Sequence, residues 1–192
     1  MRMITEYLQE QGIEFVMARE PGGCYISERI RDILLDVKSA DMNDMTEVLL
    51  YAASRVQLVD QVILPALSEG KIVLCDRYID SSIAYQGFGR KVGKDTVLKA
   101  NSYAVEYCMP DITFFFDCRP KNAFSRMNPN KVMDRLEQES AEFFKRVYEG
   151  YLDICEQNPE RVRRIDVSGT KYETRDKMRA IMKQVLKQWM GE

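Results

Sequence analysis

Residues 71–90, KIVLCDRYIDSSIAYQGFGR, join an apolar strand pattern to a polar segment that contains glycine. Residues 71–75 have an apolar centre and predict a buried parallel strand, and Asp76 and Arg77 follow it at once. Ligands of open α/β sheets bind just outside the carboxyl ends of the strands, which is where this acid and this arginine stand. A plain salt bridge between Asp76 and Arg77 is the alternative interpretation.

The residues that follow this pair are rich in small hydrogen-bonding side chains. They are Tyr78, Ser81, Ser82, Tyr85 and Gln86, closed by Gly87, Gly89 and Arg90. Hydroxyls, an amide and a guanidinium suit a pocket for a polar planar ligand that carries an anionic group. The run therefore favours a binding site over a salt bridge that only ends a strand.

The composition of the 192 residues limits the classes of function. The net charge of −2 provides no basic field for nucleic acid or an anionic membrane, so local arginines must bind any anion. The chain has no histidine, which excludes histidine-based acid–base catalysis and histidine-ligated metal sites. Five scattered cysteines without a C-x-x-C pair predict free thiols in a reducing cytoplasm, and no apolar run approaches the length of a membrane span.

Helical and strand patterns alternate along the chain. Strands are predicted at residues 13–18, 71–75, 111–117 and 162–167, and helices at 2–12, around 26–34, at 44–64, 94–107 and 136–157, and from 170 onward. This alternation predicts an α/β fold, with a doubly wound parallel sheet and helices on both faces. We expect a single domain over residues 1–192.

Two helix starts have the spacing of a capping box, in which a first side chain and a glutamate satisfy free N–H groups of the first turn. One is Asp44 with Glu47, and the other is Thr170 with Glu173. Both glutamates are therefore predicted to lie at helix ends.

A shaped loop follows the first predicted strand. It reads Arg19-Glu20-Pro21-Gly22-Gly23, in which proline fixes φ and the glycines allow close approach of the backbone. Alone it would be an ordinary turn. Its place at the carboxyl end of a strand, facing Asp76 and Arg77, makes it a candidate wall of the same pocket.

Tyr51 and Arg55 are four residues apart and share one helical face. An aromatic ring stacks on a nucleobase, and a guanidinium donates hydrogen bonds to a base carbonyl. The alternative is a surface cation–π pair, which is common in proteins.

Residues 126–136 predict a short mobile lid. Residues 128–130, Asn-Pro-Asn, interrupt the helical pattern, and Arg126, Lys131 and Arg135 supply positive charge. A solvated charged loop is the alternative.

Taken together, the motifs resemble those of the bacterial-type thymidylate kinases, from Met1 almost to the C-terminus. The matching segments are REPGG at 19–23, LLYAASRVQ at 49–57, DRYIDSSIAYQGFGR at 76–90, PDITFFFD at 110–117 and DRLE at 134–137. The resemblance implies the fold of the P-loop nucleoside monophosphate kinases, a five-stranded parallel sheet whose first, central strand is absent from this chain. It also implies transfer of the γ-phosphoryl group of ATP to dTMP, giving dTDP in dTTP biosynthesis. Positioning and charge stabilisation carry most of such a reaction, and histidine is not required.

The resemblance assigns the base and sugar end of a dTMP site. It implies that Tyr51 stacks on thymine and that Arg55 reaches a thymine carbonyl. The other residues of this end, placed around the base, the sugar and the start of the phosphate, are Glu20, Pro21, Ser81, Ser82, Tyr85 and Gln86.

The same resemblance assigns the phosphate end. Arg77 would hold the phosphate of dTMP, and Asp76 would orient a water bound to Mg²⁺. In the lid, Arg126 and Arg135 would bring positive charge over the transferring phosphate, with Arg126 and Lys131 near the phosphates of ATP. The implied partners are dTMP and ATP with Mg²⁺ and a second copy of the chain in a homodimer, with no nucleic acid and no membrane.

Three features depart from the family pattern. No G-x-x-x-x-G-K-[ST] loop occurs, and we interpret this as a start codon assigned too far downstream, with natural truncation as the alternative. Ser27 stands where the family usually has glycine, and Ser54 where it commonly has aspartate before the base-reading arginine. We therefore expect a shifted helix entry and a looser hold on Arg55. A catalytically inactive nucleotide-binding remnant, or a related kinase with altered base preference, are the competing hypotheses.

Overall fold

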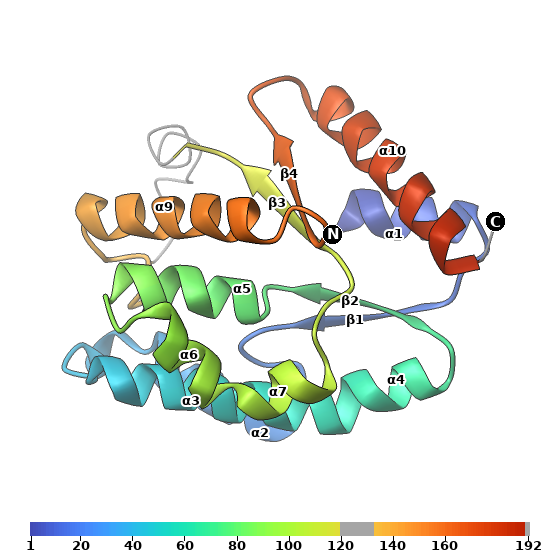
Figure 1. Cartoon of the computed structure of the whole chain (residues 1–192). Helices are drawn as coiled ribbons and strands as arrows, with labels where there is room; N and C mark the ends of the chain where they lie inside the picture. The colour runs from blue at the N-terminus through green and yellow to red at the C-terminus, as the bar shows by residue number, and fades with distance from the viewer. Residues whose placement is uncertain (120–132, 191–192) are drawn as a thin grey trace.

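The computed structural model describes residues 1–119 and 133–190 (Figure 1). In chain order the elements are α1 (Arg2–Glu10), β1 (Phe15–Arg19), α2 (Tyr25–Leu35), the 3-10 turn η1 (Val37–Ser39), α3 (Asp44–Leu58), the π-helical turn η2 (Val59–Ile63), α4 (Leu64–Ser68), β2 (Ile72–Asp76), α5 (Ile79–Ser82), the π-helical segment η3 (Ile83–Gly89), α6 (Lys94–Ala100), α7 (Ser102–Tyr107), β3 (Thr113–Asp117), α9 (Ala141–Gln157), β4 (Val162–Asp166) and α10 (Lys171–Met190). All four predicted strands are present, and their ends differ from the prediction by two residues or fewer.

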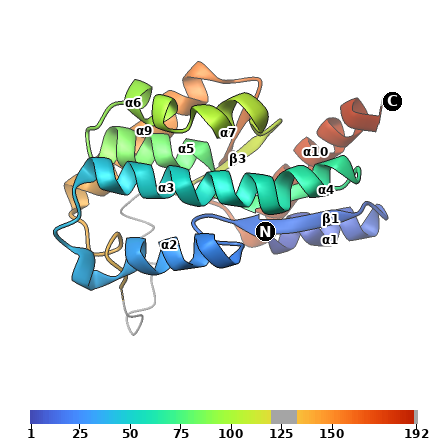
Figure 2. The ribbon, with the colours of Figure 1, turned by 90° about the horizontal axis from the view of Figure 1, so that it is seen from below.

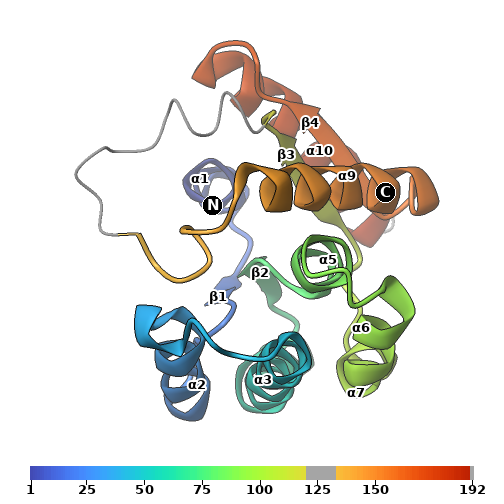
Figure 3. The same ribbon diagram turned by 90° about the vertical axis from the view of Figure 1, so that its left-hand side faces the viewer.

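Within the described residues the strands form two parallel pairs. β1 pairs with β2, and β3 pairs with β4. Figure 3 shows β1 and β2 next to each other near the centre of the view, with β3 and β4 next to each other above them. In the first pair Arg19 lies opposite Asp76, so both strands end at the same level. The loops that follow β1 and β2 therefore leave the strands at a common edge.

Helices cover both faces of the strands, which confirms the predicted doubly wound α/β class. Successive side chains of a strand point to opposite faces. Accordingly, Ile72 and Leu74 of β2 pack in one hydrophobic cluster with α1 and α10, whereas Val73 and Cys75 pack in another with α3, η3 and α9. Figure 1 shows α1 and α10 together, and an ion pair joins them between Arg179 and Glu10 at 2.6 Å.

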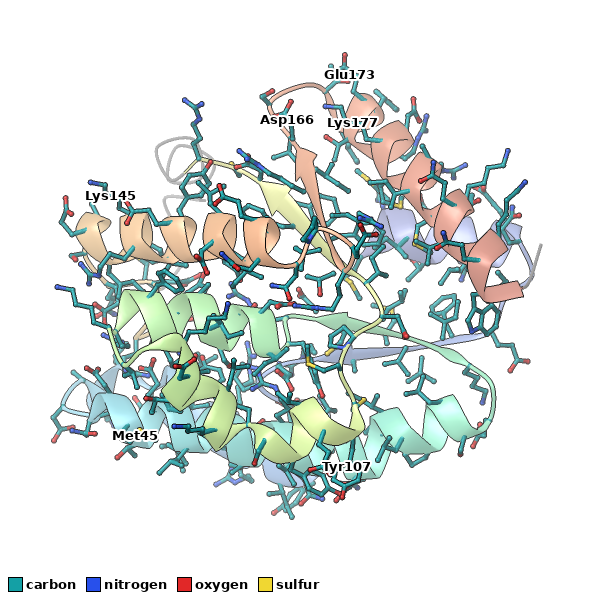
Figure 4. The ribbon with its side chains drawn as sticks, in the orientation of Figure 1. Met45, Tyr107, Lys145, Asp166, Glu173 and Lys177 are labelled. Carbon is teal, nitrogen blue, oxygen red and sulfur yellow. The ribbon has the colours of Figure 1, made fainter. Side chains whose placement is uncertain are left out.

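The start of α10 has the predicted capping box. The backbone N–H of Thr170 donates to Glu173 at 2.6 Å, and the N–H of Glu173 donates to the Thr170 hydroxyl at 3.2 Å. Figure 4 shows Glu173 and Lys177 at this end of the helix, near Asp166, and Lys177 Nζ lies 3.4 Å from Asp166 Oδ2. The reciprocal bonds fix where the last helix begins.

The start of α3 does not have the predicted capping box. Asn43 is the capping residue, and its side chain accepts a hydrogen bond from the N–H of Met45 at 2.9 Å. Glu47 is only 1% exposed and turns into the protein instead of back along its own helix. The predicted helix at 44–64 is also interrupted by η2, although α3 still leads directly into α4 (Figure 2).

Two other predicted helices differ from the structure. The helix expected at 94–107 is divided at Asn101, and the helix expected from 136 begins at Ala141, where the Ser140 side chain caps it. No helix in the two described ranges is both long enough and apolar enough to cross a membrane.

The contact between η3 and α9 depends on a residue without a side chain. A Cβ added at Gly89 would lie 2.7 Å from the ring of Phe143 and 2.9 Å from Val147, whereas one added at Gly87 would meet nothing closer than 3.6 Å. We expect Gly89→Ala to lower the free energy of unfolding by about 1–3 kcal/mol, because overpacking forces neighbours out of position. Gly87→Ala, in the same segment, is the control, and urea denaturation measures both. Equal stability of the two variants would contradict this account.

Candidate active site

A cavity of about 220 Å³ lies beyond the carboxyl ends of β1 and β2. The residues that line it are Glu20, Pro21, Arg31, Leu35, Tyr51, Arg55, Arg77, Tyr78, Ser81, Ser82, Tyr85, Gln86, Asp134, Leu136, Glu137 and Phe144. The structure thus brings all nine predicted substrate-binding residues to one cavity. They come from the loop after β1, from α3 and from the segment after β2.

Arg55 is the buried cation of this cavity. It is 1% exposed, and its Nε donates to the two carboxylate oxygens of Glu20 at 3.0 and 2.9 Å. Its Nη2 donates to Glu20 and, at 3.0 Å, to Ser82 Oγ, and its Nη1 donates to Asn101. A guanidinium has five N–H groups, and these contacts occupy four. Within the described part of the chain, one N–H on Nη1 is therefore left for an acceptor in the cavity.

Glu20 fixes this guanidinium. Burial raises the pKa of the Glu20 carboxyl above its ordinary value of 4.5, and the neighbouring charge of Arg55 opposes that rise. The residue is 5% exposed, and its carboxylate oxygens are directed at Arg55. Glu20 therefore acts in the cavity chiefly by holding Arg55 in place.

A second buried carboxylate, Glu47, lies behind Gln86. It accepts hydrogen bonds from Gln86 Nε2 at 2.8 Å, from Arg90 Nη2 at 3.1 Å and from Arg135 Nη2 at 2.6 Å. Burial alone would raise the pKa of Glu47, but these donors outweigh it and hold the pKa below 4.5. The four residues, called the Glu47 cluster below, join α3, η3 and the segment before α9.

Arg135 belongs to this cluster and does not line the cavity. Its Nε donates to the backbone carbonyl of Leu34 at 2.8 Å, and the residue is 7% exposed. The expected place of Arg135 over a transferring phosphate is therefore not the place that the structure gives it, because its guanidinium is bound to Glu47. The other two lid cations, Arg126 and Lys131, lie outside the described residues.

Arg77 occupies an unusual backbone conformation next to the cavity. Its φ of 66° lies in the left-handed region, which a residue with a side chain adopts only at a cost in energy. Its guanidinium carbon lies 4.9 Å from the centre of the Tyr85 ring, in cation–π geometry. The exposed charge of Arg77 is thus held at the cavity by the ring beneath it.

Tyrosine rings and serine hydroxyls form a further part of the polar wall, with Tyr151 behind Ser81. The Ser81 hydroxyl lies 2.8 Å from the phenol oxygen of Tyr151, and burial raises the pKa of that phenol to about 12. Burial likewise raises the pKa of Tyr51. Both phenols are therefore neutral at physiological pH, so Tyr51 offers an uncharged aromatic ring to the cavity.

The two serines that depart from the family pattern touch each other. The Ser27 hydroxyl donates to the backbone carbonyl of Ser54 at 2.8 Å, and Ser54 Oγ lies 3.4 Å from the N–H of Gly22. The helix entry that contains Ser27 is thereby tied to the helix that carries Arg55. The guanidinium of Arg55 itself is held by Glu20 and Asn101.

Asp76 stands apart from the cavity wall, as the exposed last residue of β2. Its backbone carbonyl accepts from the N–H of Glu20 at 2.9 Å. No group of three His, Cys, Asp or Glu side chains converges on a metal position among the described residues. Magnesium in nucleotide sites takes one or two carboxylates together with phosphate oxygens and water. A lone Asp76 fits such a shared ion, and does not fit a metal held by protein ligands alone.

Sequence reasoning missed three residues that shape the site. Arg31 lines the cavity and donates to the carbonyl of Pro21 at 2.8 Å, Asn101 accepts from Arg55, and Glu47 binds Gln86. Asn101 and Glu47 lie within predicted helices, where a polar residue is ordinarily solvated. The position of Arg31, two turns after the Gly-Gly of the shaped loop, was the signal that could have found it.

The chain is similar to known proteins over most of its length. A family model described as thymidylate kinase matches residues 1–178. A thymidylate kinase of Clostridium novyi (strain NT) is 43% identical over 170 residues, which cover 88% of this chain and 83% of that protein. One from Oceanobacillus iheyensis is 46% identical over 164 residues, covering 84% of this chain and 73% of that protein.

Proposed function

The chain belongs to the thymidylate kinase family, and on that basis we propose that the cavity beyond β1 and β2 is its dTMP site. The reaction is the ATP-dependent phosphorylation of dTMP to dTDP, on the way to dTTP. One observation carries the placement of dTMP. A single cavity contains a buried guanidinium with one N–H to spare, a fixed amide, an aromatic ring and an exposed arginine.

These groups match the parts of a nucleoside monophosphate. Tyr51 would stack on thymine, the spare N–H of Arg55 would donate to a base carbonyl, and Gln86 would read the base edge. Arg77 would hold the phosphate, because a guanidinium suits phosphate oxygens in fork geometry. Pro21, Ser81, Ser82 and Tyr85 would line the sugar between these ends, with Glu20 acting through Arg55.

We propose that the divalent ion of the reaction is Mg²⁺ and that Asp76 orients a water molecule on it. Such an ion neutralises charge on the transferring phosphate when it is bound. Arg77 contributes positive charge at the acceptor phosphate. We propose that Arg126 and Lys131 bind the phosphates of ATP. Arg135 would act on the site indirectly, through the Glu47 cluster.

We also propose that residues 1–192 form one domain and that two copies associate. Exposed apolar side chains on α3 and α7 support the association: Leu49 is 53% exposed, Tyr103 39% and Tyr107 57%. Light scattering should give about twice the chain mass of 22.4 kDa, and a monomer mass at all concentrations would contradict it. The five free thiols support a place in the reducing cytoplasm, and no nucleic acid or membrane partner is proposed.

Titration with a panel of monophosphates tests the function. We expect dTMP to be bound and phosphorylated in preference to dUMP by about 10- to 200-fold, the discrimination that one methyl group allows in a fitted pocket. dCMP and AMP should be poorer still, because their base edges carry the wrong donors. Equal or better use of another monophosphate would contradict the thymidylate assignment. Binding of dTMP without turnover of ATP would indicate a nucleotide-binding remnant.

A further inference from the structure

The amide of Gln86 has its orientation set from behind. Its Nε2 donates to Glu47 Oε1 at 2.8 Å, and the residue is 1% exposed although it lines the cavity. An ionised carboxylate only accepts hydrogen bonds, so Gln86 must turn its NH₂ group toward Glu47. The amide oxygen and the second N–H of Nε2 are then what Gln86 has left for a ligand, and the oxygen is its one acceptor.

The charge on Glu47 is held firmly. Arg90 and Arg135 donate to it from two further segments, and its pKa lies below the ordinary value. The carboxyl therefore stays ionised at neutral pH and cannot donate a proton to Gln86. Reversal of the Gln86 amide would place its oxygen against a buried carboxylate, with no hydrogen between the two oxygens. Glu47 thus permits one orientation of the amide only.

This orientation distinguishes pyrimidines by their N3 position. Thymine and uracil carry N3–H, which is a donor, whereas N3 of cytosine is an acceptor. We propose that Glu47 is a positioning residue for base selection: it turns the oxygen of Gln86 into the cavity, where it accepts N3–H of thymine and opposes N3 of cytosine. The inference rests on the proposed function of the cavity, and Glu47 itself touches no substrate.

Glu47→Gln tests the inference with little change in size. The introduced glutamine can keep its oxygen on the two arginines and turn its NH₂ toward Gln86, which frees Gln86 to present its own NH₂ to the cavity. We expect the ratio of dCMP to dTMP dissociation constants, measured by calorimetry, to fall by about tenfold, the value of one hydrogen bond made or opposed. The ratio of dUMP to dTMP should not change, because uracil and thymine share N3–H.

Arg90→Lys is the matched control. Arg90 donates to the same carboxylate and pairs with Glu139 at 2.5 Å, but it does not line the cavity. Its replacement should lower stability and leave the dCMP to dTMP ratio unchanged. If the Glu47 cluster only supported the fold, Glu47→Gln and Arg90→Lys would change the dCMP to dTMP ratio by the same factor.

Each outcome separates this inference from the proposed function. Wild-type protein that binds dCMP as well as dTMP would contradict the proposed function. A folded Glu47→Gln variant with the wild-type dCMP to dTMP ratio would overturn the inference alone, as would a parallel fall in the dUMP ratio. If Glu47→Gln does not fold, Glu47→Asp replaces it, because the shorter carboxylate withdraws from Gln86 while its charge remains. An unchanged ratio in that variant overturns the inference too.

Discussion

Replacing Arg77 by alanine is expected to weaken the binding of dTMP about 100-fold, through the loss of charge-assisted hydrogen bonds to its phosphate. In steady-state kinetics KM for dTMP should rise. The value of kcat should also fall, because in the proposed site the same guanidinium would orient the acceptor phosphate for attack on ATP. Calorimetry with dTMP measures the first effect without any need for turnover.

Two variants separate the role of Arg77 from simpler effects. Arg77→Lys keeps the charge but loses the planar fork that lies over Tyr85, so an intermediate affinity is expected. Arg29→Ala removes a charge from a side chain that is 70% exposed and away from the cavity lining, and should leave the affinity unchanged. Wild-type affinity in Arg77→Ala would remove Arg77 from the site.

Replacing Glu20 by glutamine is expected to cost about 3–5 kcal/mol of unfolding free energy, because it leaves a buried guanidinium without its counter-charge. The side chains of Arg55 and Glu20 are 1% and 3% exposed, so water cannot take the place of the carboxylate. The urea midpoint should fall accordingly. Affinity for dTMP should fall with it, since Arg55 would lose its fixed position.

Glu28, at the start of α2, provides the control for Glu20. Glu28 pairs with Arg19 at 2.8 Å, but the two side chains are 38% and 45% exposed, so Glu28→Gln should cost about 1 kcal/mol or less. The double variant Glu20→Gln, Arg55→Met should recover much of the lost stability, because no unpaired charge remains. A single Glu20→Gln variant as stable as wild type would mean that the buried pair does not hold the site together.

Local pattern together with the family resemblance was sufficient to find the wall of the cavity. The strand at 71–75 ends beside polar residues, and parallel strands end at a common edge, so Glu20, Arg77 and Gln86 were expected near one another before any coordinates. Helical spacing places Tyr51 and Arg55 on one face, and the family resemblance assigns that face to the base. These predictions depend on residues a few positions apart or on the geometry of neighbouring strands, and sequence displays both.

The same reasoning could not find the buried polar residues that hold the cavity wall in place. Glu47 has the spacing of a capping residue, and the nearest of its three partners in sequence is 39 residues away. Asn101 lies where a predicted helix is interrupted, and it accepts a hydrogen bond from Arg55, 46 residues earlier. A short-range pattern cannot reveal a long-range partner, and the competing local interpretation was reasonable in both cases. Sequence reasoning therefore did not predict the buried polar residues that act by holding another side chain in position.

The sequence separations around Glu47 also have a consequence for the order of folding. Its partners Gln86, Arg90 and Arg135 lie 39, 43 and 88 residues along the chain, so large loops must close before any of these bonds can form. Until then the carboxylate is better left in water, and early collapse gains nothing from burying it. We expect such contacts to form after the transition state, so that changes to them accelerate unfolding more than they slow folding. The Glu47 cluster should therefore act mainly on the rate of unfolding, and so on how long the native protein persists once it has formed.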